Sequence, residues 1–411
     1  MQTFLPVPWF ARGPLRHRTQ QIASVLTRHG LGSLIVQFGL GDLPLFSRWM
    51  RPQHDNQLTK AERFRLALAE LDATFIKLGQ ALSTRPDLLP ADMIAELSKL
   101  QDAAPAASFD QIRQILWDEL GSPPEEIFAS IEPEPMASAS IGQVHAATLK
   151  NGRQVIVKVV RPGIPELCEQ DLEILGGMAE WAEQHSQLGR DYDTAALVDE
   201  FAYRLRNELD YTCEGNNADL FRRNFAGDQG IYIPRVYWQW TTKRVLTMER
   251  LNGIKVNDLA ALEAAGIDRH AVAENAVRLM LRQVFEFGFF HADPHPGNVL
   301  VLPDGSTGLI DFGMMGRLTG KSQDTLLRMI LAISRVDADE FANELYSVGA
   351  AHGTIKQSAL KRDLAHYLDR YMSGSVKDMA TAEAGQEILS IAFKYHLQLP
   401  SELIMLIRVL M

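Results

Sequence analysis

The sequence predicts an α+β protein with two lobes, in which a small strand-rich lobe precedes a helical lobe. Three observations lead to this prediction. The 411 residues are too many for one ordinary hydrophobic core. Short strand-like runs begin near Ile127, whereas the chain after Leu251 is largely helical in pattern. The composition, with 46% hydrophobic and 22% charged residues, is typical of a globular protein. The expected division is a basic, apolar N-terminal segment, a helical extension, the strand-rich lobe and the helical lobe, at residues 1–58, 59–125, 126–251 and 252–411.

Charge and cysteine content exclude some classes of function. The net charge of -10 argues against nucleic acid as the main partner. Two cysteines, Cys168 and Cys213, are too few for a disulfide framework and have no metal-ligand spacing. A reducing cytosol is therefore the expected compartment.

The N-terminal segment has an uneven charge. No Asp or Glu precedes Asp42, while four arginines occur before it among aromatic and aliphatic residues. These are Arg12, Arg16, Arg18 and Arg28. Two interpretations of this segment stay open. It could lie on an anionic membrane surface, or it could be an arm packed on the protein's own surface.

The two ends of the chain differ in pattern. No apolar run reaches the roughly 18 to 20 residues that span a bilayer, and the N-terminus does not have the pattern of a signal peptide. At residues 402–411, ELIMLIRVLM is an apolar helical pattern that stops without Gly, Asn or Pro. We therefore expect the natural chain to continue beyond it, with room there for a membrane anchor.

The extension is expected to be helical. One helix is predicted from Thr59 to about Thr84, with an apolar face at the spacing of a buried stripe, and a second from Ala91 to Leu100. The stripe consists of Leu71, Phe75, Leu78 and Leu82. DAAPAAS at 102–108 is a predicted linker, and a short helix is expected over 109–120.

The strand-rich lobe is expected to contain a hairpin. VHAATLKNGRQVIVKVVR has two strand-like runs joined by Asn151-Gly152, a strong turn signal. Helices are predicted over 165–186 and 194–224, strands over 231–251, and a second hairpin over 299–311.

The helical lobe contains the sharpest motif, HADPHPGN at 291–298. It has the His-x-Asp-x-x-x-x-Asn spacing of a kinase catalytic loop, and Asp311-Phe312-Gly313 follows. The intervening hairpin would bring Asn298 and Asp311 to its two ends as ligands of Mg²⁺. Asp293 would orient or deprotonate the attacking oxygen. Together with the lobe order, this predicts a protein-kinase-like two-lobed fold.

A lysine strand and a loop precede this motif at kinase spacing. Lys158 ends VIVK and is expected to reach the α- and β-phosphates. MASASIGQV, upstream of it, is in the position of the phosphate loop, with alanines in place of most glycines. Since Cβ atoms restrict positive φ and close approach, we expect an altered nucleotide preference and suppressed phosphotransfer.

A helix glutamate should hold Lys158 by an ion pair. RNELDYTCEGNN at 206–217 offers Glu208 and Glu214, which six residues at 100° each would separate by 240° on one helix. One of them should therefore pair with Lys158, and the other is left for a different contact.

The strand RVLTMERL at 244–251 is expected to enter the hinge between the lobes, with Met248 near the adenine and backbone groups of 249–251 bonded to it. The expected nucleotide-binding residues are Ala137, Ser138, Ala139, Ser140, Ile141, Val144, Lys158, Met248, Glu249 and Leu251. After Gly313 the chain becomes helical almost at once, without a long activation segment or Ala-Pro-Glu. This absence argues against an ordinary protein kinase.

Several motifs together resemble the UbiB/ADCK (AarF-type) atypical kinase family over about residues 60–411. IKLGQALSTRPDLLP contains a Lys-x-Gly-Gln, formed by Lys77, Gly79 and Gln80. NELDYTCEGN contains a Glu-x-Asp, formed by Glu208 and Asp210. MASASIGQVH resembles the alanine-rich loop of the family, apart from a serine at 138 where alanine is frequent.

The resemblance implies roles for these residues. It assigns Glu214 to the ion pair with Lys158, and Glu208 and Asp210 to contacts with Lys77 and Gln80. In this family the extension is thought to cover the place where a protein substrate would bind. The five residues of the two motifs are therefore expected to be occluding or regulatory.

The resemblance also implies a function. Members support isoprenoid quinone biosynthesis at membranes, through binding and hydrolysis of ATP. We expect an atypical kinase or ATPase that binds Mg²⁺ and ATP or ADP, is cytoplasmic and peripherally membrane-associated, and acts with membrane lipids, quinone precursors or quinone-biosynthesis proteins. A homodimer is allowed. The alternatives are a phosphotransferase for a small molecule or lipid headgroup and a nucleotide-responsive, non-enzymatic scaffold.

Overall fold

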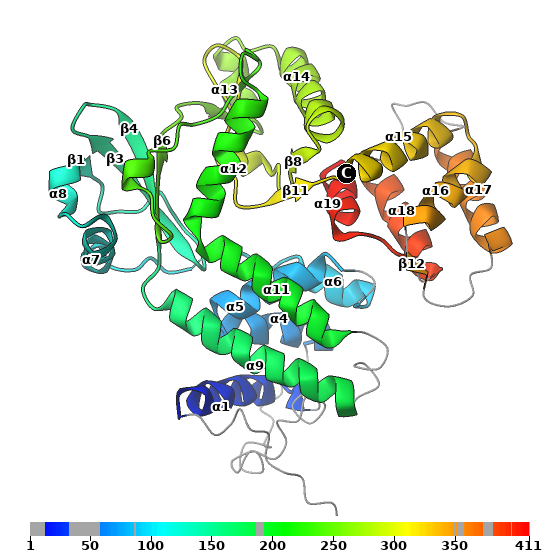
Figure 1. Cartoon of the computed structure of the whole chain (residues 1–411), viewed down its shortest axis with the longest axis horizontal. Coiled ribbons are helices and arrows are strands. Elements are labelled where there is room, and N and C mark those ends of the chain that lie inside the picture. Colours follow the sequence, from blue (N-terminus) through cyan, green and yellow to red (C-terminus); the bar gives the residue numbers. More distant parts are fainter. Residues whose placement is uncertain are drawn as a thin grey trace, which may run out of the picture. The chain divides into compact units, whose positions relative to one another are not determined.

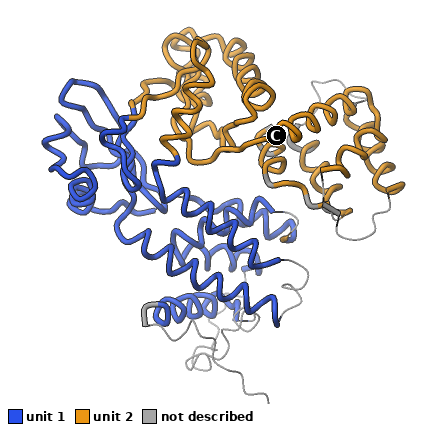
Figure 2. Tube along the Cα trace, in the orientation of Figure 1, with its two compact units in different colours: residues 1–85, 89–213, 237–248 blue, residues 86–88, 214–236, 249–411 orange. Residues whose placement is uncertain are grey.

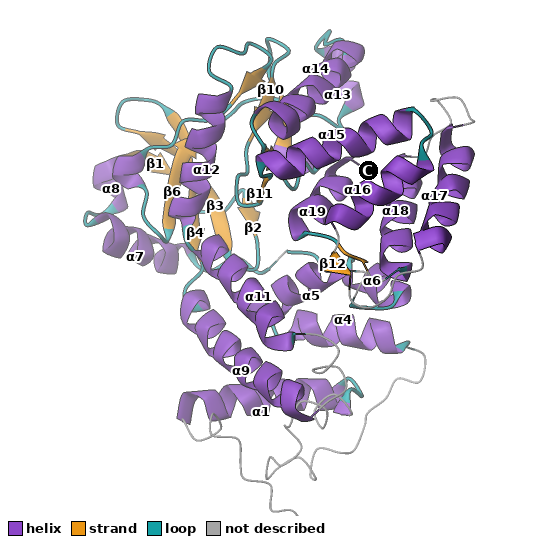
Figure 3. Ribbon diagram, turned by 45° about the vertical axis from the view of Figure 1, so that its right-hand side comes forward, coloured by secondary structure: helices purple, strands orange, loops and turns teal. Residues whose placement is uncertain are grey.

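The computed structural model describes residues 13–32, 58–85, 88–102, 104–185, 193–348, 350–351, 357–372, 381–395 and 397–410. The chain divides into two compact units, shown in Figure 2. Unit 1 comprises residues 1–85, 89–213 and 237–248, and unit 2 comprises residues 86–88, 214–236 and 249–411. Both units combine helices with strands, so the predicted α+β class is confirmed (Figure 3).

Unit 1 contains a sheet in the order β1-β3-β4-β6 (Figure 1). The short strand β2 pairs with the start of β3, on the edge of β3 that is opposite β4. Its strands are β1 (Phe128–Ile131), β2 (Ala137–Ser138), β3 (Gly142–Leu149), β4 (Gln154–Val160) and β6 (Val245–Glu249). The predicted hairpin forms β3 and β4, and Gly152 takes a φ of 83° in its turn, a conformation that glycine adopts without strain. The helices α7 (Phe109–Leu120) and α8 (Pro124–Ile127) lie beside this sheet. The bounds of α7 coincide with those predicted.

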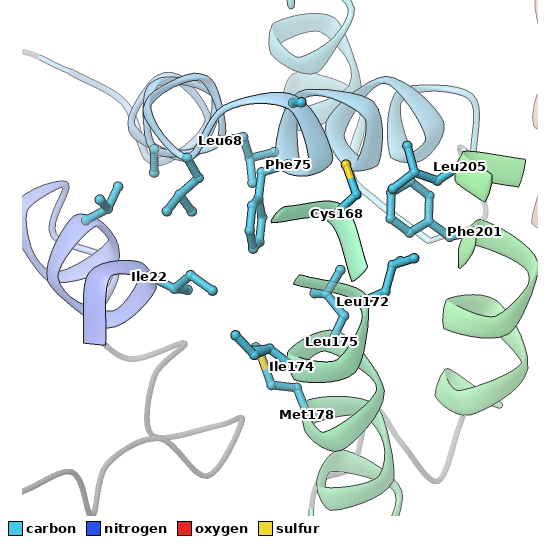
Figure 4. Packing of buried hydrophobic residues seen from close by; sticks show 14 of the residues in the cluster. Ile22, Leu68, Phe75, Cys168, Leu172, Ile174, Leu175, Met178, Phe201 and Leu205 are labelled. Atoms are coloured by element: carbon cyan, nitrogen blue, oxygen red, sulfur yellow. The ribbon is translucent and has the colours of Figure 1, made fainter. Parts of the chain in front are cut away.

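The rest of unit 1 is a group of helices with its own core. They are α1 (Gly13–Arg28), α4 (Lys60–Glu70), α5 (Ala73–Ser83), α6 (Ala91–Leu97), α9 (Ile164–His185) and α11 (Thr194–Leu209). Figure 4 shows side chains from α1, α4, α5, α9 and α11 meeting in this core, among them Ile22, Leu68, Phe75, Leu172 and Leu205. The extension therefore has an apolar core that it shares with α9 and α11.

The helix α1 decides part of the question left open for the N-terminal segment. Its Leu15 and Ile22 are buried in the helical core. Arg18 is buried too and forms a bidentate ion pair with Asp171 of α9, at 2.6 and 2.8 Å. Residues 13–28 thus pack through one face on the protein's own helices, as the docking-arm interpretation expects, while the membrane interpretation stays a prediction. Residues 1–12 and 33–57 of the predicted membrane-surface segment lie outside the described residues.

The single helix predicted over Thr59–Thr84 is wrong, because the structure has two helices there. The chain breaks between Leu71 and Asp72, where Asp72 adopts a φ of 73° that is unusual for a residue with a side chain. A contact distant in sequence accompanies the break, since Arg18 donates to the carbonyl oxygen of Leu71 at 2.8 Å. The second helix, α6, also ends earlier than predicted, at Leu97.

The helix predicted over 194–224 is likewise two helices, α11 and α12 (Tyr211–Asn224). Asp210 lies between them, and its carboxylate accepts hydrogen bonds from the backbone N–H and the hydroxyl of Thr212, at 3.0 and 2.6 Å. Aspartate side chains stabilise turns in this way and interrupt helices. From Glu214 onward, α12 belongs to unit 2.

The described part of unit 2 contains three small sheets, with strand orders β5-β10-β9-β7, β11-β8 and β12-β13. The strands are β5 (Ile231–Tyr232), β7 (Ile254–Lys255), β8 (Phe289–His291), β9 (Val299–Val301), β10 (Thr307–Leu309), β11 (Met315–Arg317), β12 (Ala350–Ala351) and β13 (Leu397–Gln398). The predicted second hairpin is β9 and β10, and Gly305 has a φ of 83° in its turn.

The helices of unit 2, besides α12, are α13 (Leu259–Ala264), α14 (Arg269–Leu281), α15 (Gly320–Ser334), α16 (Ala338–Val348), α17 (Gln357–Met372), α18 (Thr381–Lys394) and α19 (Ser401–Leu410). Helices α15 to α19 share a core that includes Met329, Phe341 and Leu364. Among the residues that the structure describes, no helix is both long and apolar enough to cross a bilayer.

Candidate functional site

The loop before the lysine strand is a tight turn between β2 and β3 in unit 1. Ala137 pairs with Val144 and Ser138 with Gln143, and the N–H of Ala139 donates to the carbonyl oxygen of Gly142 at 2.8 Å. Residues 139–142 therefore reverse the chain within one hydrogen-bonded turn. This is the compact strand–turn–strand form expected of a loop that covers phosphates.

Gly142 is the one position of this turn where a side chain would collide. A Cβ atom there would lie 2.1 Å from the hydroxyl oxygen of Tyr211 and 2.9 Å from the carbonyl oxygen of Val159. The Tyr211 side chain and the backbone of β4 therefore leave no room for a side chain at this position.

Lys158 is buried in β4, directly opposite Val144 of β3. Burial of an ammonium group is costly unless an anion compensates it. Glu214, its predicted partner, is also buried, but it lies in unit 2. The ion pair between them stays a prediction.

The Lys-x-Gly-Gln segment lies on α5 and faces residues 100–102. The Nζ atom of Lys77 contacts carboxylates of both Asp102, at 2.9 Å, and Glu208. Gln80 donates from Nε2 to the carbonyl oxygen of Leu100 at 3.3 Å. Burial works against the charge of Lys77, but the nearby Glu208 and Asp102 carboxylates outweigh it and raise the pKa of Lys77 above its ordinary value.

Gly79 of this motif is explained by packing. A Cβ atom there would lie 2.3 Å from Cδ1 of Leu100 and 2.9 Å from Cδ1 of Leu68. The glycine lets α5 approach α4 and the segment after α6, which places Lys77 beside Asp102.

The structure differs from the expectation for the Glu-x-Asp motif in two ways. Glu208 contacts Lys77, whereas Asp210 bonds Thr212 and lies 3.8 Å from Lys243, and Gln80 bonds the carbonyl oxygen of Leu100. The 240° separation of the two glutamates assumed one continuous helix, and that premise is wrong because the helix breaks at Asp210. Glu208 and Glu214 have different contacts because they lie on different helices.

Asp102 is a residue of this network that was not predicted from the sequence. While one carboxylate oxygen, Oδ2, accepts from Lys77, the other, Oδ1, accepts from the hydroxyl and the backbone N–H of Ser140, the latter at 3.3 Å. A single carboxylate thus joins the extension to the phosphate loop. Asp102 is the first residue of the predicted linker, where no such contact was expected.

The catalytic-loop motif lies in unit 2, after a π-helical turn at Arg282–Glu286 that leads into β8. The backbone N–H of Asp293 donates to Nδ1 of His291 at 3.1 Å. Asn298 donates from Nδ2 to the carbonyl oxygen of Asp293 at 3.2 Å. These local bonds fix the shape of the loop, and the Asp293 side chain is exposed.

The hairpin brings the two expected metal ligands to the same end. Leu309 pairs with Val299, and the N–H of Ile310 donates to the carbonyl oxygen of Asn298 at 3.2 Å. Asp311 is the next residue. An amide oxygen and a carboxylate beside each other suit Mg²⁺, which binds to proteins through few protein oxygens and takes further oxygens from phosphates and water. Within the described part of the chain, no group of three or more His, Cys, Asp or Glu residues forms a self-sufficient metal site.

Helix α12 holds the Asp-Phe-Gly segment by its backbone. Glu214 accepts from the N–H of Phe312 at 3.3 Å, and Asn217 donates to its carbonyl oxygen at 3.0 Å. The ring of Phe312 is fully buried beside Phe221 and His291. Asn217 was not predicted, although it lies one helical turn after Glu214 and therefore on the same face.

The hinge residues are placed on either side of the division between the units. Met248 is fully buried in β6. The N–H of Glu249 donates to the carbonyl oxygen of Arg235 at 2.9 Å, and its carboxylate accepts from Tyr232. That N–H, one of the backbone groups predicted to bond adenine, is therefore already bonded within unit 2, and the contact of residues 249–251 with adenine stays a prediction.

The chain is similar to known proteins over most of its length. A family model described as the ABC1 atypical kinase-like domain matches residues 99–345. The chain is 37% identical over 406 residues to a probable protein kinase UbiB of Marinobacter nauticus, covering 96% of this chain and 73% of that one. It is 40% identical over 343 residues to an uncharacterized Synechocystis protein, sll1770, covering 83% of this chain.

A plant relative and a solved structure extend the likeness. The chloroplastic protein ACTIVITY OF BC1 COMPLEX KINASE 7 of Arabidopsis thaliana is 38% identical over 357 residues, or 87% of this chain. The chain spans 59% of the length of the Synechocystis relative and 51% of the plant one. The complex of Rv3197 with erythromycin from Mycobacterium tuberculosis matches with a TM-score of 0.56 and 25% identity, covering 83% of this chain and 87% of that one.

Proposed function

The chain belongs to the ABC1 atypical kinase-like family, the UbiB/ADCK group, and on that premise we propose that it is a Mg²⁺-dependent ATPase. Its nucleotide cycle would support the biosynthesis of an isoprenoid quinone at a membrane. The observation that carries the enzymatic part is the shared end of the β9–β10 hairpin, where Asn298 and Asp311 lie next to each other after the catalytic-loop motif.

Each residue has a role in this proposal. The Lys158 ammonium binds the α- and β-phosphates, and the turn at 139–142 covers them. Asn298 and Asp311 hold Mg²⁺, which supplies charge neutralisation on the phosphates when bound. The exposed Asp293 carboxylate accepts a hydrogen bond from the attacking oxygen, and orients or deprotonates it.

Suppressed protein phosphorylation is part of the proposal. The chain passes from Gly313 through β11 to α15, which begins at Gly320, so only a short segment follows the Asp-Phe-Gly motif. A protein kinase needs a longer activation segment there to hold a peptide substrate. Water, a small molecule or a lipid headgroup is therefore the preferred acceptor class.

ATP turnover tests the proposal. It is measured with Mg²⁺, with and without anionic liposomes that carry a phenolic quinone precursor. Wild type is compared with Asp311→Asn, and Asp324→Asn serves as the matched control because Asp324 is an exposed carboxylate on α15. We expect turnover by wild type and control, and a loss of at least a hundredfold in Asp311→Asn, because a metal ligand contributes several kcal/mol to transition-state stabilisation.

Two results would change the proposal. Absence of turnover under all conditions, with unchanged nucleotide binding in Asp311→Asn, would replace the enzyme by a nucleotide-responsive scaffold. Transfer of labelled phosphate to a lipid or small molecule would replace the ATPase by a phosphotransferase.

A further inference from the structure

The carboxylate of Asp102 occupies a set of donors that resembles a phosphate site. Its Oδ1 atom accepts from the hydroxyl and, at 3.3 Å, from the backbone N–H of Ser140. Its Oδ2 atom accepts from the Nζ atom of Lys77 at 2.9 Å. A loop amide, a hydroxyl and an ammonium group are the donors with which proteins bind phosphate oxygens. In this structure these donors instead bind the carboxylate of Asp102, which belongs to the protein itself.

The segment that carries Asp102 follows the loop over several residues. The N–H of Ala104 donates to the carbonyl oxygen of Ser138 at 3.4 Å, and the N–H of Ala107 donates to Oε1 of Gln143 at 2.8 Å. Residue 102 and residues 104–107 are thus bonded to β2, β3 and the turn between them. This anchoring places the Asp102 charge at the turn in a fixed position.

The charges around this contact do not cancel. Lys77 supplies one positive charge, whereas Glu208 and Asp102 each supply a negative charge. Arg161 adds a positive charge, because its guanidinium donates to the carbonyl oxygen of Ser140 at 2.9 Å, and Asp72, 3.9 Å from Arg161, adds a negative one. The five side chains therefore carry two positive and three negative formal charges. Lys77 has an exposed fraction of 14%, and Glu208 and Asp102 each have one of 35%. Removal of the Asp102 charge therefore makes the potential at the turn less negative for any anion that the turn covers.

We propose that Asp102 is a specificity-determining residue of the phosphate loop, whose charge disfavours nucleotides in proportion to their phosphate charge. This inference rests on the proposed function, because it assumes that the turn at 139–142 covers nucleotide phosphates. An energy of this kind scales with the charge of the ligand, so ATP is disfavoured more than ADP. Asp102 acts on selectivity rather than on the chemical step.

Three variants separate charge from structure. Asp102→Asn keeps the size of the side chain and an oxygen acceptor for Ser140, but removes the negative charge. Ser140→Ala removes the hydroxyl partner and leaves the charge. Asp110→Asn removes an exposed carboxylate at the start of α7 and is the matched control.

The measurement is the Kd of ATP and of ADP, each with Mg²⁺, together with the Tm without nucleotide. For Asp102→Asn we expect tighter binding of both nucleotides and a ratio Kd(ATP)/Kd(ADP) that falls about fivefold, as one unit charge at partly screened distance predicts. Asp110→Asn should leave the ratio unchanged. Ser140→Ala alters the loop but keeps the Asp102 charge, so it should not lower the ratio, whatever its effect on the two affinities. Lys77→Met makes the charge more negative, so the ratio should rise, and this second variant decides the question if Asp102→Asn does not fold.

The outcomes distinguish this inference from the proposed function. If wild type binds neither nucleotide, both are overturned. If wild type binds nucleotides but Asp102→Asn changes both Kd values by the same factor, or lowers both affinities along with the Tm, the carboxylate is structural and only this inference is overturned. A change of ratio in Asp110→Asn as large as in Asp102→Asn would also overturn it, because the effect would then not depend on the contact with the loop.

Discussion

Asn217 of α12 donates a hydrogen bond to the carbonyl oxygen of Phe312 at 3.0 Å, across 95 residues of sequence. Glu214, one turn earlier on the same helix, accepts from the N–H of the same residue. Both polar backbone groups of Phe312 are thus satisfied by side chains of one helix, in surroundings where the Phe312 side chain is fully buried. The place of the Asp-Phe-Gly segment therefore depends on α12.

Asn217→Ala should loosen this segment. Loss of a side-chain donor leaves the Phe312 carbonyl unsatisfied, which costs about 1–3 kcal/mol in the free energy of unfolding. ATP turnover should fall by about tenfold or more, because Asp311 precedes Phe312 and loses its fixed position. Denaturant unfolding and Mg²⁺-ATP turnover measure the two effects. The control is Asn216→Ala, an exposed neighbour on α12, and equal behaviour of the two variants would contradict the assigned role.

Gly142→Ala should distort the phosphate loop. The added methyl group would meet the hydroxyl of Tyr211 at 2.1 Å and the carbonyl oxygen of Val159 at 2.9 Å. We expect a loss of about 1–3 kcal/mol in stability and weaker nucleotide binding. The double variant with Tyr211→Phe should recover only part of the loss, because the Val159 carbonyl belongs to β4 and stays in place. Full recovery in the double variant would show that the tyrosine alone sets the constraint.

Ala139→Gly tests the opposite change in the same turn. Removal of the methyl group frees the backbone next to the bond from Ala139 N–H to the Gly142 carbonyl. We expect a changed affinity for ATP relative to ADP and increased autophosphorylation, with a cost of about 0.5–1 kcal/mol in stability. Titration of both nucleotides and labelled-phosphate incorporation are the measurements. If neither changes, the alanines of this loop are tolerated without a restraining role.

Local signals were enough to predict some elements of the fold. The helix at 109–120 is preceded by Ser108, which forms a capping box with Gln111, and is followed by Gly121, which has a φ of 71°. Residues next to each end of the helix therefore determine where it begins and ends. The hairpin turns at Gly152 and Gly305 are also local, with φ of 83° at each. The spacing of the catalytic-loop motif and the Asp-Phe-Gly segment depended on the second of these turns.

Contacts distant in sequence account for what was not predicted. The apolar stripe has Leu71 before the break and Phe75 after it at helical spacing, so periodicity alone could not show the break, which Arg18 contacts from 53 residues away. Asp102 likewise accepts a hydrogen bond from the hydroxyl of Ser140, which lies 38 residues later in the sequence. A single sequence contains no direct record of such pairs, since neither residue type nor spacing identifies the partner.

Gly79→Ala should weaken the attachment of α5. Its Cβ would lie 2.3 Å from Cδ1 of Leu100 and 2.9 Å from Cδ1 of Leu68. Both are ends of side chains that can move, so we expect a loss of about 1–3 kcal/mol rather than complete unfolding. Gly176→Ala is the matched control, because this glycine of α9 has open space around its Cβ and should gain about 0.5–1 kcal/mol.

A double-mutant cycle separates the clash from other effects of Gly79→Ala. In a Leu100→Ala background the nearest colliding atom is absent, so the added cost of Gly79→Ala should shrink by about 1 kcal/mol or more. Thermal or denaturant unfolding of the four proteins gives the coupling. An additive result would mean that the glycine is required for a reason other than its contact with Leu100.

The last prediction concerns the dependence of stability on pH in unit 2. The carboxylate of Asp228 accepts from Arg278 at 2.6 and 2.9 Å, from Arg282 and from the N–H of Gly230. These bonds, with Arg278 the largest cause, lower the pKa of Asp228 from 3.8 to about 2. Because the folded-state pKa is below the unfolded one, the unfolded chain binds more protons between these values. The stabilisation is therefore complete above about pH 4 and is lost as the pH falls toward 2, by about 1–2 kcal/mol after allowance for screening by solvent.

Asp228→Asn removes this titration, so the difference in Tm between wild type and variant should narrow as the pH is lowered from 5 to 2.5. Asp324→Asn, which changes an exposed carboxylate on α15, is measured in parallel as the control. A constant difference between wild type and Asp228→Asn over this range would mean that the carboxylate stabilises the fold by its shape and hydrogen bonding alone, without a change in its pKa.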